Sequence, residues 1–277
     1  MKSRVISMLV LALALPLLAV SARADTLGAT LDTFAVLGGT PVVSFAAGND
    51  TITGNVGISP AALSGITVAS PSTFILTGTE YGGATSNAGM AQAGLTNALT
   101  VLGGLASVGT SQNNLNGVSL NPGVYDISAA DLTGTLTLTN TLDVTDPSWV
   151  FIGSALTSSG SVVTAPGLFD EADAGVFWVI TGGSSGSATL SGTFLGNVLA
   201  STSITTTGVT DSCGRLLAST GDVTFAGNNT ISDTCSASAS GLSGGTVTSP
   251  VPEPGTFTLL ATGLLGVAGV FRRRLSA

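Results

Sequence analysis

The sequence predicts a mainly β protein, a parallel β-solenoid with one α-helix on its flank. Apolar residues alternate with small or hydroxylated residues over most of the chain, the alternating runs recur at fairly regular intervals, and helical periodicity is confined to one stretch. A solenoid needs such repeats because each coil covers the core of the coil before it. An irregular β-sandwich would also alternate, and it stays the alternative on periodicity alone.

Five short runs carry the repeat, and each reads mostly apolar, Thr, apolar, small or Thr, then Gly or Asn. They lie at 136–140, 156–160, 188–192, 204–208 and 223–227. The intervals between them are 20, 32, 16 and 19 residues, and the longest is attributed to an insertion around 168–185. More apolar runs follow at 150–152, 176–180, 194–199 and 215–217. Outward Thr residues of successive coils would then form columns with a spacing of about 4.8 Å along the solenoid axis.

The helical stretch covers roughly 84–102, where apolar residues recur at a spacing of three to four. This stripe consists of Met90, Ala91, Leu95, Ala98, Leu99 and Leu102. One amphipathic helix among strands has to bury its apolar stripe. We therefore expect the helix to pack against the side of the solenoid.

Both ends of the chain read as targeting segments. Residues 1–24 combine a charged start, an apolar run from Val5 to Val20 and the small-x-small triplet ending at Ala24, which predicts a secretory signal peptide rather than an uncleaved anchor. Residues 251–277 combine Pro252-Glu253-Pro254, an apolar run and three arginines, which is a stop-transfer arrangement. The chain between them, 25–250, is long enough for one large domain with its own core.

The composition of the 25–250 body excludes several classes of function. It holds fourteen acidic residues and a single basic residue, Arg215, and the chain has no histidine. A body with this excess of negative charge does not bind nucleic acid by charge. Two cysteines without histidine cannot complete a metal site, and we expect neither a metal nor a cofactor. In an oxidising compartment we expect Cys213 and Cys235 to form a disulfide, with two buried thiols as the alternative.

Several segments of the body, in order, resemble the exported ice-binding proteins of the DUF3494 type. They include 33–39, 54–60, 121–125, 132–138, 149–152, 176–178, 194–200 and 214–218, and the likeness extends from Leu27 to Ser232. The resemblance implies a discontinuous right-handed parallel β-solenoid with one long helix alongside. It also implies an antifreeze function, in which a flat face adsorbs to ice and inhibits its growth and recrystallisation.

The resemblance further implies that the ice-binding residues are Thr, Ser and Asn on one solenoid face. The motif Thr, Ala or Gly, any residue, Thr or Asn, found in some members, fits 207–210 fully and 226–229 except at its first position. The side chains expected on the face are Thr53, Thr137, Thr139, Thr141, Thr157, Ser159, Ser161, Thr189, Ser191, Thr193, Thr205, Thr207, Thr210, Thr224 and Asn228. The ligand would be the surface of an ice crystal, bound by a monomer.

The C-terminal triplet, apolar run and arginine cluster resemble the PEP-CTERM sorting tail of Gram-negative bacteria. That resemblance implies transient insertion of the tail in the inner membrane, processing by an exosortase after signal peptidase has acted, and a final place outside the cell, at its surface or in exopolysaccharide. A permanent anchor is the alternative.

Two other functions compete with ice binding. A solenoid enzyme acting on polysaccharide would need a carboxylate pair or a strong base, but Asp143 and Asp146 read as a turn, and Asp170, Glu171 and Asp173 as a solvated loop. We therefore expect no enzyme. A surface or matrix adhesion protein is the stronger alternative, because it would use the same fold and export route.

Overall fold

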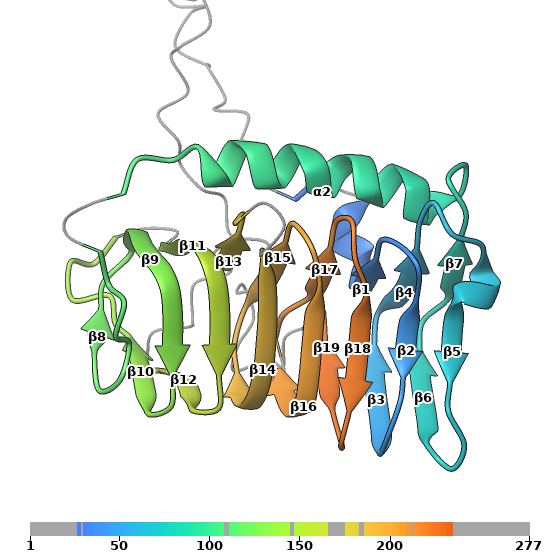
Figure 1. The fold of residues 1–277 in the computed structure, drawn as a ribbon. Coiled ribbons are helices and arrows are strands. Elements are labelled where there is room, and N and C mark those ends of the chain that lie inside the picture. Colours follow the sequence, from blue (N-terminus) through green and yellow to red (C-terminus); the bar gives the residue numbers. More distant parts are fainter. Residues whose placement is uncertain are drawn as a thin grey trace, which may run out of the picture.

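The computed structural model describes residues 27–28, 30–107, 111–144, 147–165, 175–182, 186–211 and 213–234. Nineteen strands in this part of the chain form one continuous sheet, wound into a solenoid, and neighbouring strands pair in parallel (Figure 1). The predicted signal peptide, the predicted tail and Cys235 lie outside the described residues. The predicted mainly β solenoid is confirmed.

Each coil contributes strands to three faces, which we name the helix face, the broad face and the narrow face. The helix face consists of β1 (Phe34–Gly38), β4 (Asn55–Ile58), β7 (Glu80–Gly82), the first halves of β9 (Gly123–Leu132) and β11 (Ser148–Ser158), β13 (Gly175–Ile180), β15 (Asn197–Ala200) and β17 (Leu216–Ala218). The broad face consists of β2 (Val43–Phe45), β5 (Ile66–Val68), the second halves of β9 and β11, the first halves of β14 (Ser187–Phe194) and β16 (Ile204–Asp211), and β18 (Val223–Ala226). The narrow face consists of β3 (Asn49–Thr53), β6 (Thr73–Thr77), β8 (Ser119–Leu120), β10 (Thr135–Leu138), β12 (Ser161–Thr164), the second halves of β14 and β16, and β19 (Thr230–Ser232).

The stack of coils does not follow the order of the chain. The last coil, β17 to β19, pairs on one side with β15 and β16 and on the other with β1, β2 and β3 of the first coil. In Figure 1 the orange strands of the last coil therefore lie beside the blue strands of the first. The C-terminal coil is thus enclosed within the stack, and the solenoid is discontinuous, as the resemblance implied.

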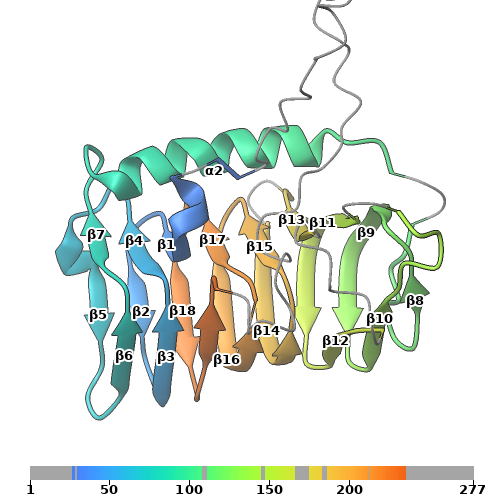
Figure 2. The same cartoon turned by 180° about the vertical axis from the view of Figure 1, so that it is seen from behind.

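Helix α2 (Asn87–Gly103) runs along the stack and connects its two ends (Figures 1 and 2). At about 1.5 Å per residue its 17 residues measure about 25 Å, roughly five strand-to-strand steps of about 4.8 Å. It begins at the N-cap Ser86, whose Oγ accepts a hydrogen bond from the amide of Ala88 (3.1 Å). The predicted helix at 84–102 is confirmed, but Met90 was wrongly placed in its buried stripe, because its side chain is 56% exposed.

The helix face is apolar on both of its sides, which explains the more apolar runs found in the sequence. One side of each strand faces the interior of the solenoid and the other faces α2 or the 3-10 helix η2 (Leu31–Thr33). All six residues of β13 are consequently buried. The second 3-10 helix, η3 (Leu63–Gly65), lies beside β7 at the opposite end of the stack from β8.

The interior of the solenoid contains stacked aromatic side chains. The ring centroids of Phe151 and Trp178 lie 4.1 Å apart, and those of Phe45 and Phe225 lie 4.8 Å apart. Trp178 donates its indole N–H to the carbonyl oxygen of Leu195 (3.0 Å). A fully buried aromatic side chain stabilises a fold by roughly 1.5–3 kcal/mol, so these rings hold successive coils in register.

Glycines form the corner between the broad and narrow faces. Gly192 and Gly208, in β14 and β16, have φ of 80° and 74°, a conformation that favours glycine. A Cβ at Gly192 would also collide with the carbonyl oxygen of Gly160, the corner residue of the preceding coil. The chain can therefore turn at this corner without interrupting either strand, and the angle between the two faces is fixed by backbone.

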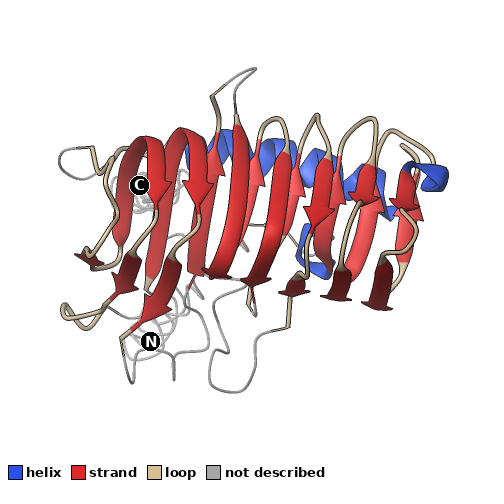
Figure 3. Ribbon diagram, turned by 60° about the horizontal axis from the view of Figure 1, so that its bottom comes forward, coloured by secondary structure: helices blue, strands red, loops and turns tan. Residues whose placement is uncertain are grey.

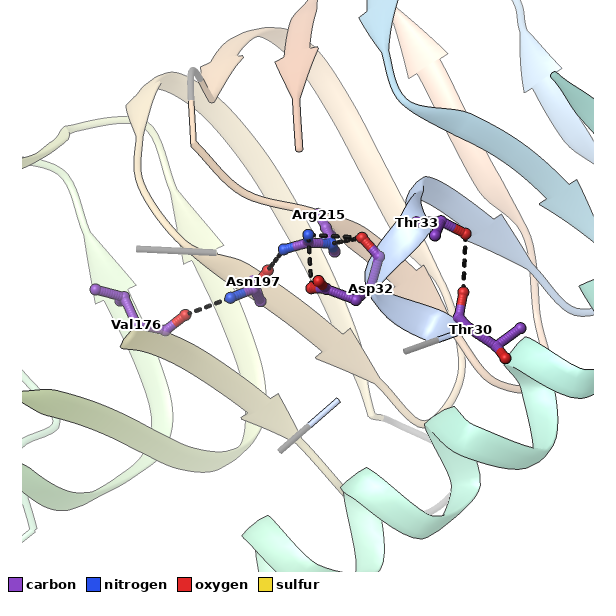
Figure 4. A network of polar contacts seen from close by, with 6 residues as sticks. All are labelled: Thr30, Asp32, Thr33, Val176, Asn197 and Arg215. Carbon is purple, nitrogen blue, oxygen red and sulfur yellow. Dashed lines mark hydrogen bonds and ion pairs between the residues drawn. The ribbon is translucent and has the colours of Figure 1, made fainter. Parts of the chain in front are cut away.

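Arg215 joins the last coil to the first and is 98% buried (Figure 4). Its Nη2 lies 2.7 Å from Asp32 Oδ1, and Nε and Nη2 donate to the Asp32 carbonyl oxygen. Its Nη1 donates to Asn197 Oδ1 (2.9 Å), and Asn197 Nδ2 donates to the carbonyl oxygen of Val176 (3.2 Å). The body's single basic residue is therefore part of the scaffold.

A second polar contact, made by Asn229, joins the last coil to its two neighbouring coils at the narrow face. Asn229 donates from Nδ2 to Asp50 Oδ1 (2.7 Å) and accepts at Oδ1 from the amide of Val209 (2.9 Å). Cys213 is buried, whereas Cys235 lies outside the described residues, so the disulfide between them stays a prediction.

Candidate functional site

The broad face carries an unbroken column of hydroxyl side chains, which we name the broad-face ladder. In strand order its members are Thr157, Thr189, Thr205, Thr224, Ser44 and Thr67, and each pairs in register with the next. The residues on either side of each member point inward, so the alternation of period two fixes which side chains face water. The column crosses the junction between the last coil, at Thr224, and the first coil, at Ser44.

Two further outward columns flank this ladder. One contains Ala129, Ala155, Ser187, Ser203, Asp222, Val42 and Gly65, and the other contains Thr133, Ser159, Ser191, Thr207, Ala226, Ala46 and Ala69. Most of these side chains are small, and the charged ones lie at the margins. Asp131 ends the central column and Asp222 lies in an outer column, where its Oδ1 accepts from the amide of Val42 (3.1 Å). The broad face is thus three columns wide and largely uncharged.

The narrow face carries a second column, the narrow-face ladder, on the other side of the glycine corner. Its members are Thr135, Ser161, Thr193, Thr210, Thr230 and Thr51, again paired in register from strand to strand. The column ends at Ile75, which is 60% exposed. Strands β14 and β16 end one residue after their ladder Thr, so the narrow face has a single outward column in the middle of the stack.

The hydroxyl groups of both ladders have no hydrogen-bond partner among the described residues. Other surface hydroxyls do bond to the protein: Thr141 Oγ1 donates to Asn121 Oδ1 (2.8 Å), and Thr220 Oγ1 donates to the carbonyl oxygen of Ser201 (2.8 Å). In the described ranges, no hydrogen bond joins neighbouring hydroxyls within either ladder, whereas Ser187 and Ser203, neighbours in a flanking column, are joined by one (Oγ–Oγ 3.0 Å). The ladder hydroxyls are therefore available to water.

The structure divides the predicted site residues between the two faces. Thr157, Thr189, Thr205 and Thr224 belong to the broad-face ladder, and Ser159, Ser191 and Thr207 to its flanking column beside the corner. Ser161, Thr193 and Thr210 belong to the narrow-face ladder, with Thr53 and Thr137 in a second narrow-face column. The prediction of a single face for all of them is therefore corrected.

The alignment of the run 136–140 with the other four was wrong. Thr137 pairs with Ser119 and Val163 on the narrow face, whereas Asp131 is the residue in register with Thr157. The error arose because both faces alternate apolar residues with Thr, so the sequence pattern does not tell them apart. The other four runs are aligned as predicted, with Leu156, Ala188, Ile204 and Val223 in one inward column.

Three more predicted residues lie outside both ladders. The hydroxyls of Thr139 and Thr141 are directed to Asn121, and Asn228 Oδ1 accepts from the amide of Asn49 (2.9 Å). These side chains serve turns at the ends of strands. They are not part of either outward column.

Sequence reasoning missed five ladder residues: Ser44, Thr51, Thr67, Thr135 and Thr230. Ser44 and Thr67 each lie between apolar residues, as in the recognised runs, so the signal was present. What the sequence did not reveal is that the first coil stacks on the last.

The described residues offer little for catalysis or metal binding. They contain no group of three or more metal-ligating side chains. Asp143 is exposed and in a turn, while Asp146, Asp170, Glu171 and Asp173 lie outside the described residues. No described helix is long and apolar enough to cross a membrane.

A β-solenoid whose flat face carries a central column of hydroxyls, unbonded within the described residues, has the architecture of proteins that bind extended, ordered surfaces. Residues 36–232 match the family described as ice-binding-like. The chain belongs to this family.

Relatives and solved structures agree with this assignment. An ice-binding protein of Nostoc sp. (strain HG1) is 39% identical over 263 residues, covering 88% of this chain and 86% of the relative. The crystal structure of an ice-binding protein from an Antarctic biological consortium superposes with a TM-score of 0.63 at 29% identity, over 78% of this chain and 94% of the other. A DUF3494 domain of a Shewanella frigidimarina ice-binding protein has the same fold, with a TM-score of 0.61 at 24% identity over 76% of this chain and 97% of the other.

The C-terminal segment has a match of its own. Residues 250–274 match the PEP-CTERM protein-sorting motif, which confirms the resemblance of the tail. The motif indicates export and sorting to the cell surface in bacteria.

Proposed function

We propose that the protein binds ice through the broad face and inhibits the growth and recrystallisation of ice crystals. The observation that carries this proposal is the column of six in-register residues whose hydroxyls have no hydrogen-bond partner in the part of the chain that the structure describes. Thr suits the role because branching at Cβ restricts χ1, so the ladder loses little side-chain entropy on binding. Water ordered over its methyl and hydroxyl groups would merge with the ice lattice, and the adsorbed protein would then block growth.

Three features favour the broad face over the narrow face as the main site. It has three outward columns, its ladder does not run into an exposed apolar residue such as Ile75, and the residues beside the ladder are mostly Ser, Ala or Thr. A rigid crystal surface requires a flat partner, because any protruding side chain holds the two surfaces apart. The small flanking residues keep the broad face flat.

The test is a substitution at the centre of the broad face. Thr189→Tyr should reduce the gap between the melting and freezing temperatures of a single ice crystal about tenfold or more, since each tenfold loss in affinity needs only about 1.4 kcal/mol. The matched control is Asn97→Tyr, an exposed residue of α2 far from both ladders. Circular dichroism and thermal unfolding should be unchanged in both variants.

The opposite pattern would contradict the proposal. If Thr189→Tyr keeps the wild-type gap while remaining folded, the broad face is not the main site. If purified wild-type protein leaves ice growth unimpeded, the adhesion function becomes the better interpretation.

The sorting motif supports an extracellular site of action. We propose that signal peptidase removes 1–24 and that an exosortase recognises 251–277 in the inner membrane of a Gram-negative cell. The body, a monomer, would then be secreted or held at the cell surface or in exopolysaccharide. There it could bind ice around the cell, and mass spectrometry of the mature protein would determine whether both ends are removed.

A further inference from the structure

The same coils that build the broad-face ladder also build the narrow-face ladder. Five successive coils each place one hydroxyl residue on either side of the corner. The pairs are Thr157 and Ser161, Thr189 and Thr193, Thr205 and Thr210, Thr224 and Thr230, and Ser44 and Thr51. The two ladders therefore run parallel along the stack.

Strand propensity does not explain the composition of the narrow-face ladder. Val, Ile, Tyr and Phe are as well suited as Thr to an outward strand position, yet six consecutive members are Thr or Ser before Ile75 ends the column. Their hydroxyls stabilise nothing in the described part of the protein, and four of the six, Thr135, Thr193, Thr210 and Thr230, are exposed. The column thus has the property that defines the broad-face ladder, which is free hydroxyls at a fixed spacing.

The two ladders are also held rigidly with respect to one another. Strands β14 and β16 each run through the corner, so Thr189 and Thr193 belong to one strand. Figure 3 shows the strands of successive coils stacked in layers, with α2 alongside. A rigid corner between two regular columns is complementary to a ligand that is itself rigid and periodic in two directions.

We propose that the narrow-face ladder is a second ice-binding surface, which adsorbs to a different set of ice planes from the broad face. This inference rests on the proposed function, because its ligand is the same crystal. One molecule then presents two flat surfaces that meet at the glycine corner. A crystal face that does not fit one surface can then be bound by the other.

The experiment is an ice-plane affinity measurement with four fluorescently labelled proteins. Single-crystal ice hemispheres are grown slowly in the wild type, Thr189→Tyr, Thr193→Tyr and Thr207→Tyr, and the labelled planes are recorded. Thr189 and Thr193 are both exposed residues of β14, so each variant is the control of the other. Thr207 is exposed in the broad-face column beside the corner, next to Gly208, so its substitution disturbs both surfaces.

The wild type should label two sets of planes. Thr189→Tyr should lose one set, Thr193→Tyr should lose the other, and Thr207→Tyr should weaken both. If Thr193→Tyr labels the same planes as the wild type with the same intensity, the narrow face does not bind ice and the inference is overturned, while the broad-face proposal stands. If Thr193→Tyr loses all planes and Thr189→Tyr loses none, the broad-face proposal fails instead, and the narrow face is the main site.

Discussion

Arg215 links four successive coils through its guanidinium group, from Val176 by way of Asn197 to Asp32. Arg215→Met keeps much of the side-chain volume but removes the guanidinium that donates to Asn197 Oδ1 and forms the ion pair with Asp32. Removing one partner of a buried ion pair costs about 3–5 kcal/mol. Because Asp32 is 40% exposed and can be hydrated, we expect the lower end, about 3 kcal/mol less free energy of unfolding in urea.

Arg215→Lys is the matched control for this prediction. Lys keeps the charge but not the planar set of donors, so it should recover part of the lost stability. If Arg215→Met unfolds at the same urea concentration as the wild type, the network does not hold the junction.

Asp211 should make the fold less stable as the pH rises. Burial raises the pKa of this inward-facing carboxyl to about 7, although hydrogen bonds from the amides of Cys213 and Gly196, and the charge of Arg215, act against it. Unfolding returns the carboxyl to a pKa near 3.8, so the folded state holds its proton more strongly. The stability due to this group is complete below about pH 4 and is lost as the pH rises through about 7.

The measurement compares the wild type with Asp211→Asn across this range. The free energy of unfolding of the wild type should fall by up to about 4 kcal/mol between pH 4 and pH 8, at about 1.36 kcal/mol per pKa unit. Burial also raises the pKa of Asp50 and of Asp233, so some dependence should persist in the variant. Equal slopes for the two proteins would show that Asp211 is not the source.

At the scale of elements, the sequence predicts strands and helix well because each has a local signature. Four of the five repeated runs were aligned in their true register, since Leu156, Ala188, Ile204 and Val223 all begin an inward-outward alternation. The helix was located to within three residues at each end. The side of the helix that is buried was harder to predict, because Ala, Gly and Thr surround the few large apolar residues, and Met90 was assigned to the wrong side.

The site was less predictable than the elements. Which side of a strand faces water follows from alternation, but which of two alternating faces a run belongs to depends on where the chain turns. That turn is set by glycines such as Gly160 and Gly192, whose role depends on the coil beneath them rather than on neighbouring residues. The sequence also does not distinguish a hydroxyl that is bonded to the protein, as in Thr141, from one that is not, as in Thr157.

At the scale of the whole molecule, the discontinuous stack makes the binding surface depend on both ends of the body. Ser44 and Thr67 extend the broad-face ladder from the first coils, which reach their position only by pairing with the last coil. A purely linear repeat protein gains stability coil by coil and can lose terminal coils separately. Here the first coils pair with the last coil, and α2 packs along the strands of both.

We therefore expect the body to unfold in one cooperative transition. Tryptophan fluorescence reports on two coils near the β9 end of the stack, through Trp149 in β11 and Trp178 in β13, whereas circular dichroism reports on all strands, and their urea midpoints should coincide. Arg215→Met should move both midpoints together, because the junction it weakens couples all the coils. If part of the dichroism is lost before the fluorescence changes, the first coils unfold separately. Ser44 and Thr67, the outer third of the broad-face ladder, would then be lost under conditions that leave its centre intact.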